Sequence, residues 1–358
     1  MKKKICLVTG GTGGHIYPAL ALASKWREMD DVEEIFFIGN DDRMEATLVP
    51  SYDYPFYALH TSGLVGGFFS KAKAILQLVK AYSVAKKYLK QKQPNLVVGF
   101  GGYVCAPVIL AAHSLKIPTM IHEQNSIVGK SNKVVMNKVD KIVTCYEKCS
   151  EVFPMEKTVL LGNPRGTIAK EAEFDQEYFK SLGLSMNRKT ILIMMGSLGS
   201  SSVNELMKDA LKNVDFGLQF LYVCGKDNDK DLDLFKGKEN IVVVPYVDTL
   251  KIYGKIDGMI CRAGATTLAE VTALGIPSIL IPSPYVANNH QFYNASMLVQ
   301  KNAARMIEEK DLNAQTLEKA IKDLFGDEKA MAETRNCALA LGKPNAAYDM
   351  IELANQIL

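Results

Sequence analysis

The stretch TGGTGGHIYPALALA, residues 9–23, joins an apolar run to a helical pattern through a turn rich in glycine. The run ICLV precedes it, and apolar residues from Ile16 to Trp26 follow at helical spacing. Glycine is favoured where the backbone takes positive φ or where another group must approach it closely. The stretch therefore predicts strand, glycine turn and helix, and the helix N-terminus offers N–H groups to an anion. For one such loop, a tight turn without a ligand is the alternative.

Ten apolar runs alternate with helical stretches along the chain, which is typical of parallel sheets covered by helices on both faces. These runs are ICLV, EIFFIG, NLVVGF, PTMIHE, KIVTC, ILIMMG, LQFLYVCG, NIVVVP, GMIC and PSILIP. Glycine clusters follow two more of them, at 99–103 and near 196–199. We therefore expect an α/β fold of two doubly wound, Rossmann-like parallel-sheet domains that face each other across a cleft. Glycine and proline at 161–166 suggest the boundary between them.

Length and composition agree with this organisation. At about 150 residues per domain, 358 residues suggest two domains, and 48% hydrophobic with 23% charged residues indicates a globular protein. The seven cysteines form no CxxC pair, and Cys6, Cys224 and Cys261 lie in apolar runs, so we expect reduced core thiols in a cytoplasmic protein. Glycines and a proline interrupt the longest uncharged stretch, 94–115, so no transmembrane segment is expected.

Positive charge is concentrated in one part of the chain. Residues 54–122 contain eight lysines and no acidic residue. Within them, the stretch 68–90 sets aromatic and aliphatic residues against lysines, which suggests an amphipathic surface for anionic lipid. Its expected membrane residues are Phe68, Phe69, Lys71, Lys73, Ile75 and Lys80, whereas core positions are favoured for Leu76 and Val79. An ordinary solvated helix is the alternative, and no motif supports nucleic-acid binding.

The segment 261–295 carries the strongest chemical signal. Arg262 follows the run GMIC, and Gly264 and Ala265 allow a helix to begin directly after it. An arginine beside a helix N-terminus indicates a diphosphate site. Glu270, one to two turns into that helix, could accept both hydroxyls of a ribose, although a solvated glutamate is the plainer interpretation.

Other nucleotide chemistries fit less well. The first glycine turn has Ile16 where the dinucleotide fingerprint GxGxxG needs its last glycine, and the P-loop motif GxxxxGK[ST] is absent. No Asp-x-Asp or His/Cys cluster is placed at the expected diphosphate, so we expect no metal and no cofactor.

Taken together, these segments resemble one family. TGGTGGHIYPALALA, DDRMEA, GGYVCAPV, IHEQNSIVGKSNK, GNPR and RAGATTLAE with HQFYNA are similar to the MurG family of N-acetylglucosamine transferases, from residue 9 to about 344. The resemblance implies a GT-B glycosyltransferase that moves N-acetylglucosamine from UDP-GlcNAc, with inversion, to the 4-hydroxyl of the muramyl sugar of lipid I (undecaprenyl-pyrophosphoryl-MurNAc-peptide), forming lipid II.

The resemblance also implies domains, location and partners. Residues 1–163 would bind acceptor and membrane, 164–343 would bind UDP-GlcNAc, and 344–358 would form a helix that packs back on the first domain. The protein would lie peripherally on the cytoplasmic face of the bacterial cell membrane, with an anionic membrane surface and cell-wall or division proteins as partners.

Site residues follow from the same resemblance. His15, as the general base, and Asn125 would be the catalytic residues; Asn125 would reach the donor sugar, and His122 would orient Asn125. The donor would be bound by Thr12, Gly13, Gly14, Asn125, Arg165, Ser197, Val247, Arg262, Ala265, Glu270 and Gln291, and the acceptor by Gly13, Gly14, Gly101, Gly102 and Tyr103. Two departures stand out: Met195 replaces a glycine of the third loop, and Arg165 follows Pro164 directly instead of two residues later.

Two other functions remain open at this point. Another two-domain UDP-sugar enzyme, such as a different glycosyltransferase or a UDP-GlcNAc 2-epimerase, would share the arginine–glutamate segment. A non-catalytic lipid-binding module would use only the basic face, and the arginine–glutamate pattern would then have no purpose.

Overall fold

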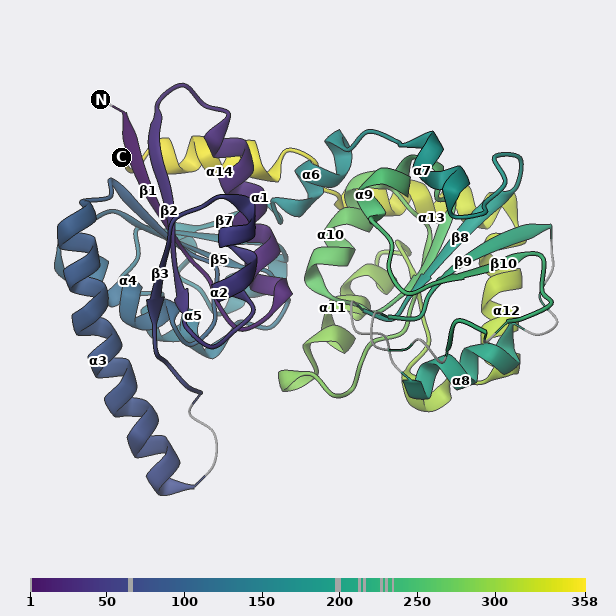
Figure 1. The fold of residues 1–358 in the computed structure, drawn as a ribbon, viewed down its shortest axis with the longest axis horizontal. Helices are drawn as coiled ribbons and strands as arrows, with labels where there is room; N and C mark the ends of the chain where they lie inside the picture. The colour runs from purple at the N-terminus through teal and green to yellow at the C-terminus, as the bar shows by residue number, and fades with distance from the viewer. Residues whose placement is uncertain are drawn as a thin grey trace. The chain divides into compact units, whose positions relative to one another are not determined.

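The computed structural model describes residues 2–358 except 64–66, 197–200, 212–213, 215–216, 226–227, 229–230 and 234. The chain forms two compact units, Met1–Arg165 with Asn345–Leu358 (unit 1) and Gly166–Pro344 (unit 2). Each unit is a parallel sheet with helices packed on it (Figure 1). The expected α/β fold of two doubly wound domains is confirmed.

Unit 1 contains a seven-stranded sheet in the order β3-β2-β1-β4-β5-β6-β7. Its strands are β1 (Lys3–Val8), β2 (Val32–Asn40), β3 (Phe56–Leu59), β4 (Leu96–Gly99), β5 (Thr119–Glu123), β6 (Lys141–Thr144) and β7 (Thr158–Leu160). Its helices are α1 (Gly13–Arg27), α2 (Glu45–Leu48), α3 (Phe68–Lys92), α4 (Cys105–Ser114), α5 (Lys130–Val135) and α14 (Ala346–Asn355).

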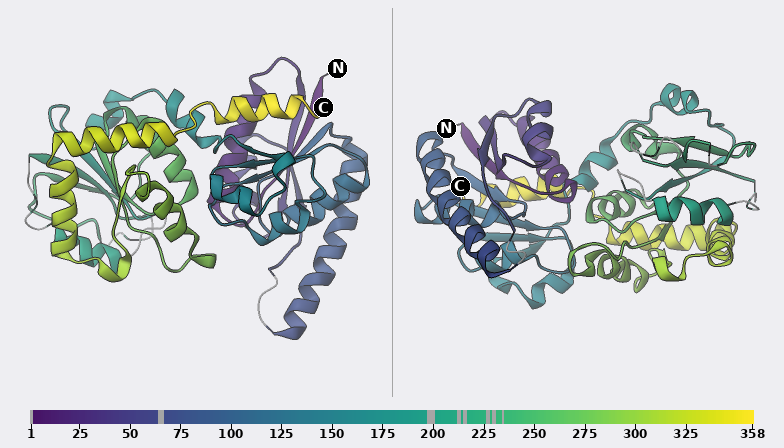
Figure 2. Two further views of the ribbon diagram at one scale, coloured as in Figure 1. Left: turned by 180° about the vertical axis from the view of Figure 1, so that it is seen from behind. Right: turned by 60° about the horizontal axis from the view of Figure 1, so that its bottom comes forward.

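Alternate residues of each central strand of unit 1 enter different cores, because successive side chains of a strand point to opposite faces. Ile5 and Leu7 of β1 pack with α1 and α14, whereas Cys6 and Val8 pack with α3 and α4. The C-terminal helix α14 is therefore part of the unit 1 core, and it lies beside α1 (Figure 2).

Unit 2 contains a six-stranded sheet in the order β10-β9-β8-β11-β12-β13. Its strands are β8 (Lys189–Met194), β9 (Leu218–Val223), β10 (Ile241–Val244), β11 (Gly258–Cys261), β12 (Ser278–Leu280) and β13 (Arg305–Met306). Its helices are α6 (Arg165–Glu171), α7 (Gln176–Ser181), α8 (Ser201–Ala210), α9 (Thr249–Ile252), α10 (Ala265–Leu274), α11 (His290–Val299), α12 (Ala314–Phe325) and α13 (Glu328–Leu341). One core joins β8, β9 and β11 to α8 and α12.

All ten apolar runs form strands, and three further strands were not predicted. β3, β7 and β13 are short, lie at or next to sheet edges, and are only partly buried, so they lack a continuous apolar run. Cys6, Cys224 and Cys261 are buried, as expected for core thiols. No helix in the described part of the chain is long and apolar enough to cross a membrane.

Candidate active site

In unit 1, both glycine loops lie where the strand order reverses. β1 pairs in parallel with β4, β2 continues the sheet on one side, and β5 continues it on the other. Ligands of open α/β sheets bind beyond the carboxyl ends of the strands at this point. The first loop follows Val8 of β1 and the second follows Gly99 of β4, so the topology brings them to one place.

The two loops are in direct contact and need their glycines. A Cβ on Gly102 (φ +84°) would lie 2.5 Å from the carbonyl oxygen of Gly10, and a Cβ on Gly101 (φ +111°) would lie 2.6 Å from Cδ2 of His15. The His15 imidazole therefore lies against the second loop. Its Nδ1 is 3.2 Å from Oγ1 of Thr12. The structure thus brings four of the expected unit 1 residues together.

The segment HEQN, residues 122–125, lies beside the two glycine loops and forms hydrogen bonds with them. Gln124 donates from Nε2 to the carbonyl of Phe100 at 2.7 Å and to that of Gly14 at 3.4 Å, so it links the two glycine loops. The buried Glu123 carboxylate accepts from the N–H groups of Asn125 (3.1 Å) and Gly129 (2.8 Å). These contacts fix the loop that presents Asn125.

His122 is a core residue. Its side chain is fully buried, its Nε2 donates to the Gly162 carbonyl at 3.0 Å, and its ring lies against Phe100. Burial lowers the pKa of His122 to about 4, so the ring is neutral at physiological pH. Glu123 holds the backbone of Asn125, and His122 packs β5 against the segment after β7. That His122 orients the Asn125 side chain stays a prediction.

In unit 2, the strand order reverses between β8 and β11, which pair in parallel. Arg262 directly follows β11, and α10 begins at Ala265 after the N-cap residue Gly264. Val247, buried, follows β10 and precedes the N-cap of α9. Ser197, expected after β8, lies outside the described residues. The described donor residues Arg262 and Ala265 thus lie at the reversal point.

Arg262 forms an ion pair that the sequence did not predict. Its guanidinium lies 2.6 Å from a carboxylate oxygen of Glu309, which follows β13, and Nη1 donates to the Ile281 carbonyl at 3.1 Å. Both side chains are about nine-tenths buried. Arg262 therefore connects the carboxyl ends of β11, β12 and β13, and part of its charge is balanced within unit 2.

Glu270 also has a partner. The Tyr253 hydroxyl donates to its Oε2 at 2.6 Å, and both residues are buried. Glu270 is thus a buried, oriented carboxylate and not the solvated glutamate of the plainer interpretation.

In α11, Gln291 accepts from the Ser283 N–H at 2.9 Å through its amide oxygen, which fixes the orientation of that amide.

Arg165 lies at the end of unit 1, where α6 begins. Its N–H donates to the side chain of Asn163 at 3.0 Å, and its guanidinium lies 5.8 Å from the ring centre of Tyr17 in α1.

Tyr103 follows the second glycine loop and is half exposed. A Cβ on Gly63 would lie 2.7 Å from its ring, so the two residues are in close contact.

The first half of α3 extends beyond the rest of unit 1 (Figures 1 and 2). Lys71, Lys73 and Lys80 are exposed, as are Phe69 (87%) and Ile75 (53%). The side chain of Phe68 is outside the described part. Core positions were expected for Leu76 and Val79, and this was wrong: they are 70% and 60% exposed. Buried alanines, such as Ala81 and Ala85, form the packed face of α3 instead.

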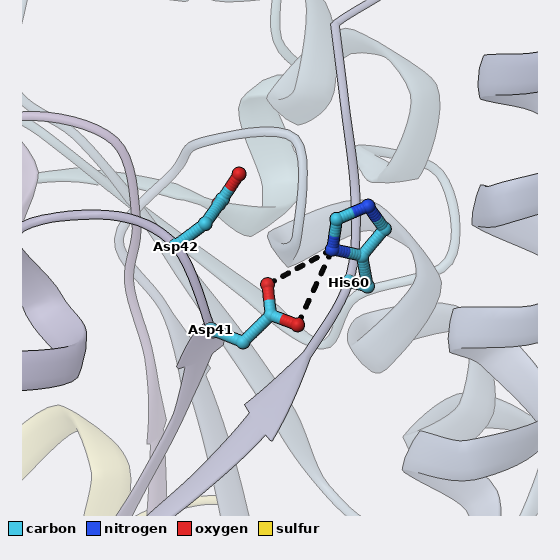
Figure 3. A group of neighbouring side chains, drawn as sticks. All are labelled: Asp41, Asp42 and His60. Atoms are coloured by element: carbon cyan, nitrogen blue, oxygen red, sulfur yellow. Dashed lines mark hydrogen bonds and ion pairs between the residues drawn. The ribbon is translucent and has the colours of Figure 1, made fainter.

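Among the described residues, one group could hold a metal ion: Asp41, Asp42 and His60, all exposed. They follow β2 and β3, and Nδ1 of His60 lies 3.0 and 3.2 Å from the two carboxylate oxygens of Asp41 (Figure 3). They are not among the residues expected to bind the diphosphate.

Comparisons with known proteins cover nearly the whole chain. Residues 5–144 match the glycosyltransferase family 28 N-terminal domain, and residues 190–353 match its C-terminal domain. The chain is 40% identical over 367 residues, 99% of both chains, to a Bacillus cereus protein named UDP-N-acetylglucosamine–N-acetylmuramyl-(pentapeptide) pyrophosphoryl-undecaprenol N-acetylglucosamine transferase 1. A relative of that kind from Halalkalibacterium halodurans is 38% identical over 99% of both chains.

Solved structures agree on the fold. Acinetobacter baumannii MurG superposes with a TM-score of 0.81 at 27% identity, covering 99% of both chains. A UDP-GlcNAc 2-epimerase from Neisseria meningitidis, bound to UDP-GlcNAc, superposes with a TM-score of 0.65 at 14% identity, covering 99% of this chain and 100% of that one. The second likeness concerns the fold alone.

Fold, loops and matches define a two-domain glycosyltransferase of family 28. Within that class, the chain belongs to the MurG family, the UDP-N-acetylglucosamine–N-acetylmuramyl-(pentapeptide) pyrophosphoryl-undecaprenol N-acetylglucosamine transferases.

Proposed function

We propose that the chain transfers N-acetylglucosamine from UDP-GlcNAc to the 4-hydroxyl of the muramyl sugar of lipid I, giving lipid II in peptidoglycan synthesis. The observation that carries the proposal is the 40% identity to the Bacillus cereus transferase over 99% of both chains, which includes both units. An epimerase resembles the chain only in fold, at 14% identity, and a lipid-binding module would need no buried Tyr253–Glu270 pair.

The donor binds unit 2 in this proposal. The diphosphate lies against the N-terminus of α10, where the helix amides and dipole favour an anion. A Cβ on Gly264 would meet nothing within 4 Å, so the protein leaves room for a close ligand there. Glu270 binds the ribose. The uracil lies near Val247, and the sugar lies near Ala265 and Gln291, with Ser197 and Asn125 completing the contacts.

The acceptor binds unit 1. Its diphosphate lies on the N–H groups of Gly13, Gly14, Gly101 and Gly102. His15 removes the proton of the muramyl hydroxyl as that oxygen attacks the anomeric carbon, and the bond to the UDP oxygen breaks, so UDP leaves and the configuration inverts. The helix N-terminus and Arg262 stabilise the charge that develops on the departing diphosphate.

The membrane is the third partner in this proposal. The substrate lipid I is anchored in the cytoplasmic leaflet, so the enzyme works peripherally at that surface. The exposed lysines and apolar side chains of α3 support this, since each lysine near an anionic surface contributes about 1 kcal/mol. Cell-wall and division proteins are proposed as further partners.

Two variants test the site. Glu270→Ala should raise KM for UDP-GlcNAc at least tenfold, because it removes a ribose contact made in ground and transition states alike. His15→Ala should lower kcat by ~10²–10⁴-fold with donor binding kept. Wild-type donor kinetics in Glu270→Ala would place the donor elsewhere, and a mild loss in His15→Ala would assign the base to another group.

The transfer reaction needs no metal ion in this proposal, so activity should survive EDTA. Collapse of activity in EDTA with recovery on Mg²⁺ would refute the metal-free mechanism.

A further inference from the structure

We infer that Glu45 is a positioning residue of the acceptor site: its buried carboxylate holds the first glycine loop so that the N–H groups of residues 12–14 face the acceptor diphosphate. The inference rests on the proposed function and refines it, because it divides the loop into a part held by the protein and a part left for the ligand.

Glu45, the first residue of α2, is fully buried and hydrogen-bonded through both oxygens. Oε2 accepts from the Gly11 N–H at 3.0 Å. Oε1 accepts from the backbone N–H and the side-chain Nδ2 of Asn40, both at 3.0 Å. Asn40 in turn accepts from the Thr61 hydroxyl. One carboxylate therefore ties the first glycine loop, after β1, to the end of β2 and, through Asn40, to the segment after β3.

The packing around this carboxylate leaves it little freedom. A Cβ on Gly10 would lie 2.7 Å from Oε1 of Glu45, and a Cβ on Gly39 would lie 2.7 Å from its Cγ. Because Gly10 and Gly39 have no side chains, the Glu45 side chain has room between the strand ends. Gly11 has φ +94°, and a Cβ there would meet nothing within 4 Å, so there is open space on that side of the residue. Its N–H points the other way, to the buried Glu45 carboxylate.

Several backbone N–H groups in and after the first glycine loop are already used in hydrogen bonds within the protein. The Gly11 N–H is taken by Glu45, and those of His15 and Ile16 are taken by the Thr12 carbonyl, at 3.0 and 3.2 Å. The first N–H groups of a helix have no partner within the helix. The amides that α1 offers to an anion are thus those at 12–14, and their direction depends on the peptide that Glu45 anchors. A Cβ on Gly14 would meet only Oγ1 of Thr12, at 3.7 Å, so this side of the loop has room for a close ligand.

The test is Glu45→Gln. The amide keeps the size of the side chain but places an NH2 group against an N–H donor at either Gly11 or Asn40, so the loop must shift. We expect KM for a short-chain lipid I analogue to rise at least tenfold while KM for UDP-GlcNAc stays within twofold. Glu34→Gln is the matched control, since Glu34 lies on β2, the strand that ends at Asn40, but pairs with Lys92; both KM values should stay within twofold.

Two more variants separate the possible failures. Asn40→Ser removes one donor to Glu45 and should raise the acceptor KM in the same direction but less, which keeps the test available if Glu45→Gln does not fold. Gly14→Ala should raise the acceptor KM without lowering the melting temperature. If it does so while Glu45→Gln and Asn40→Ser leave the acceptor KM unchanged, or raise both KM values equally, the role of Glu45 is overturned. If Gly14→Ala changes nothing, the acceptor site itself is misplaced, and the proposal fails with this inference.

Discussion

At the scale of single residues, Tyr253 orients Glu270, the carboxylate proposed to bind the ribose. Its hydroxyl occupies Oε2 and orients the carboxylate. Tyr253→Phe keeps the ring and removes this hydrogen bond, so UDP affinity should fall about three- to tenfold, consistent with a bond to a charged group worth roughly 1.5–3 kcal/mol at most.

Calorimetry with UDP and with 2′,3′-dideoxy-UDP measures this effect. The loss should appear for UDP and vanish for the dideoxy analogue, which has no hydroxyls for Glu270. An equal loss for both nucleotides would mean that Tyr253 supports the fold and not the ribose contact.

Arg262 has a proposed role in the transfer reaction and an observed role in joining the strand ends, and a single substitution would affect both. Arg262→Ala should lower turnover, but it also leaves the buried Glu309 without its cation, and breaking a buried ion pair costs about 3–5 kcal/mol. The double variant Arg262→Ala with Glu309→Gln should recover much of the stability in urea unfolding while turnover stays low. Recovery of turnover as well would show that Arg262 acts only by holding the strand ends together.

Several residues that contact the site residues could not be predicted from the sequence, and the reason is the same for each. Residue types and spacing predicted that His15 and the glycine loops lie beyond strand ends and that Glu270 lies one to two turns into the helix after Arg262. Glu309 meets Arg262 from 47 positions away, and Gln124 joins two loops 86 positions apart in the chain, between Gly14 and Phe100. Such contacts depend on tertiary register, which one sequence does not contain.

At the scale of elements, apolar runs predicted central strands well because these are buried on both faces. The edge strands and the face of α3 were harder. Leu76 and Val79 look like core residues, but the packed face of α3 uses small residues such as Ala74, Ala81 and Ala85, which let the helix lie close to the rest of unit 1. Leu76 and Val79 are thereby left on the outside.

That exposed face carries a prediction for membrane binding. Lys71, Lys73 and Lys80 changed together to glutamate should reduce co-sedimentation with vesicles of anionic lipid at least tenfold, because three cations become anions at the surface. The control changes three exposed lysines of unit 2, Lys170, Lys208 and Lys322, to glutamate. Binding that ignores the α3 changes, or that falls equally in the control, would remove α3 from the mechanism.

At the scale of the whole molecule, the chain passes between its two units twice. It leaves unit 1 after Arg165 and returns at Asn345, and α14 then completes the unit 1 core with Ala347, Met350 and Ile351. The stretch 161–166, with two glycines and one proline, contains this first passage. Each unit carries its own reversal point with loops beyond the strand ends, which is why the proposal assigns acceptor and donor to different units.

The most direct test of the transfer reaction follows UDP release and sugar products together. The purified protein is incubated with UDP-GlcNAc, with and without a short-chain lipid I analogue. We expect UDP release only when the acceptor is present, together with a glycolipid whose new N-acetylglucosamine is β-linked at the muramyl 4-oxygen. Formation of UDP-N-acetylmannosamine without acceptor, or no glycosylated product despite tight UDP-GlcNAc binding, would contradict it.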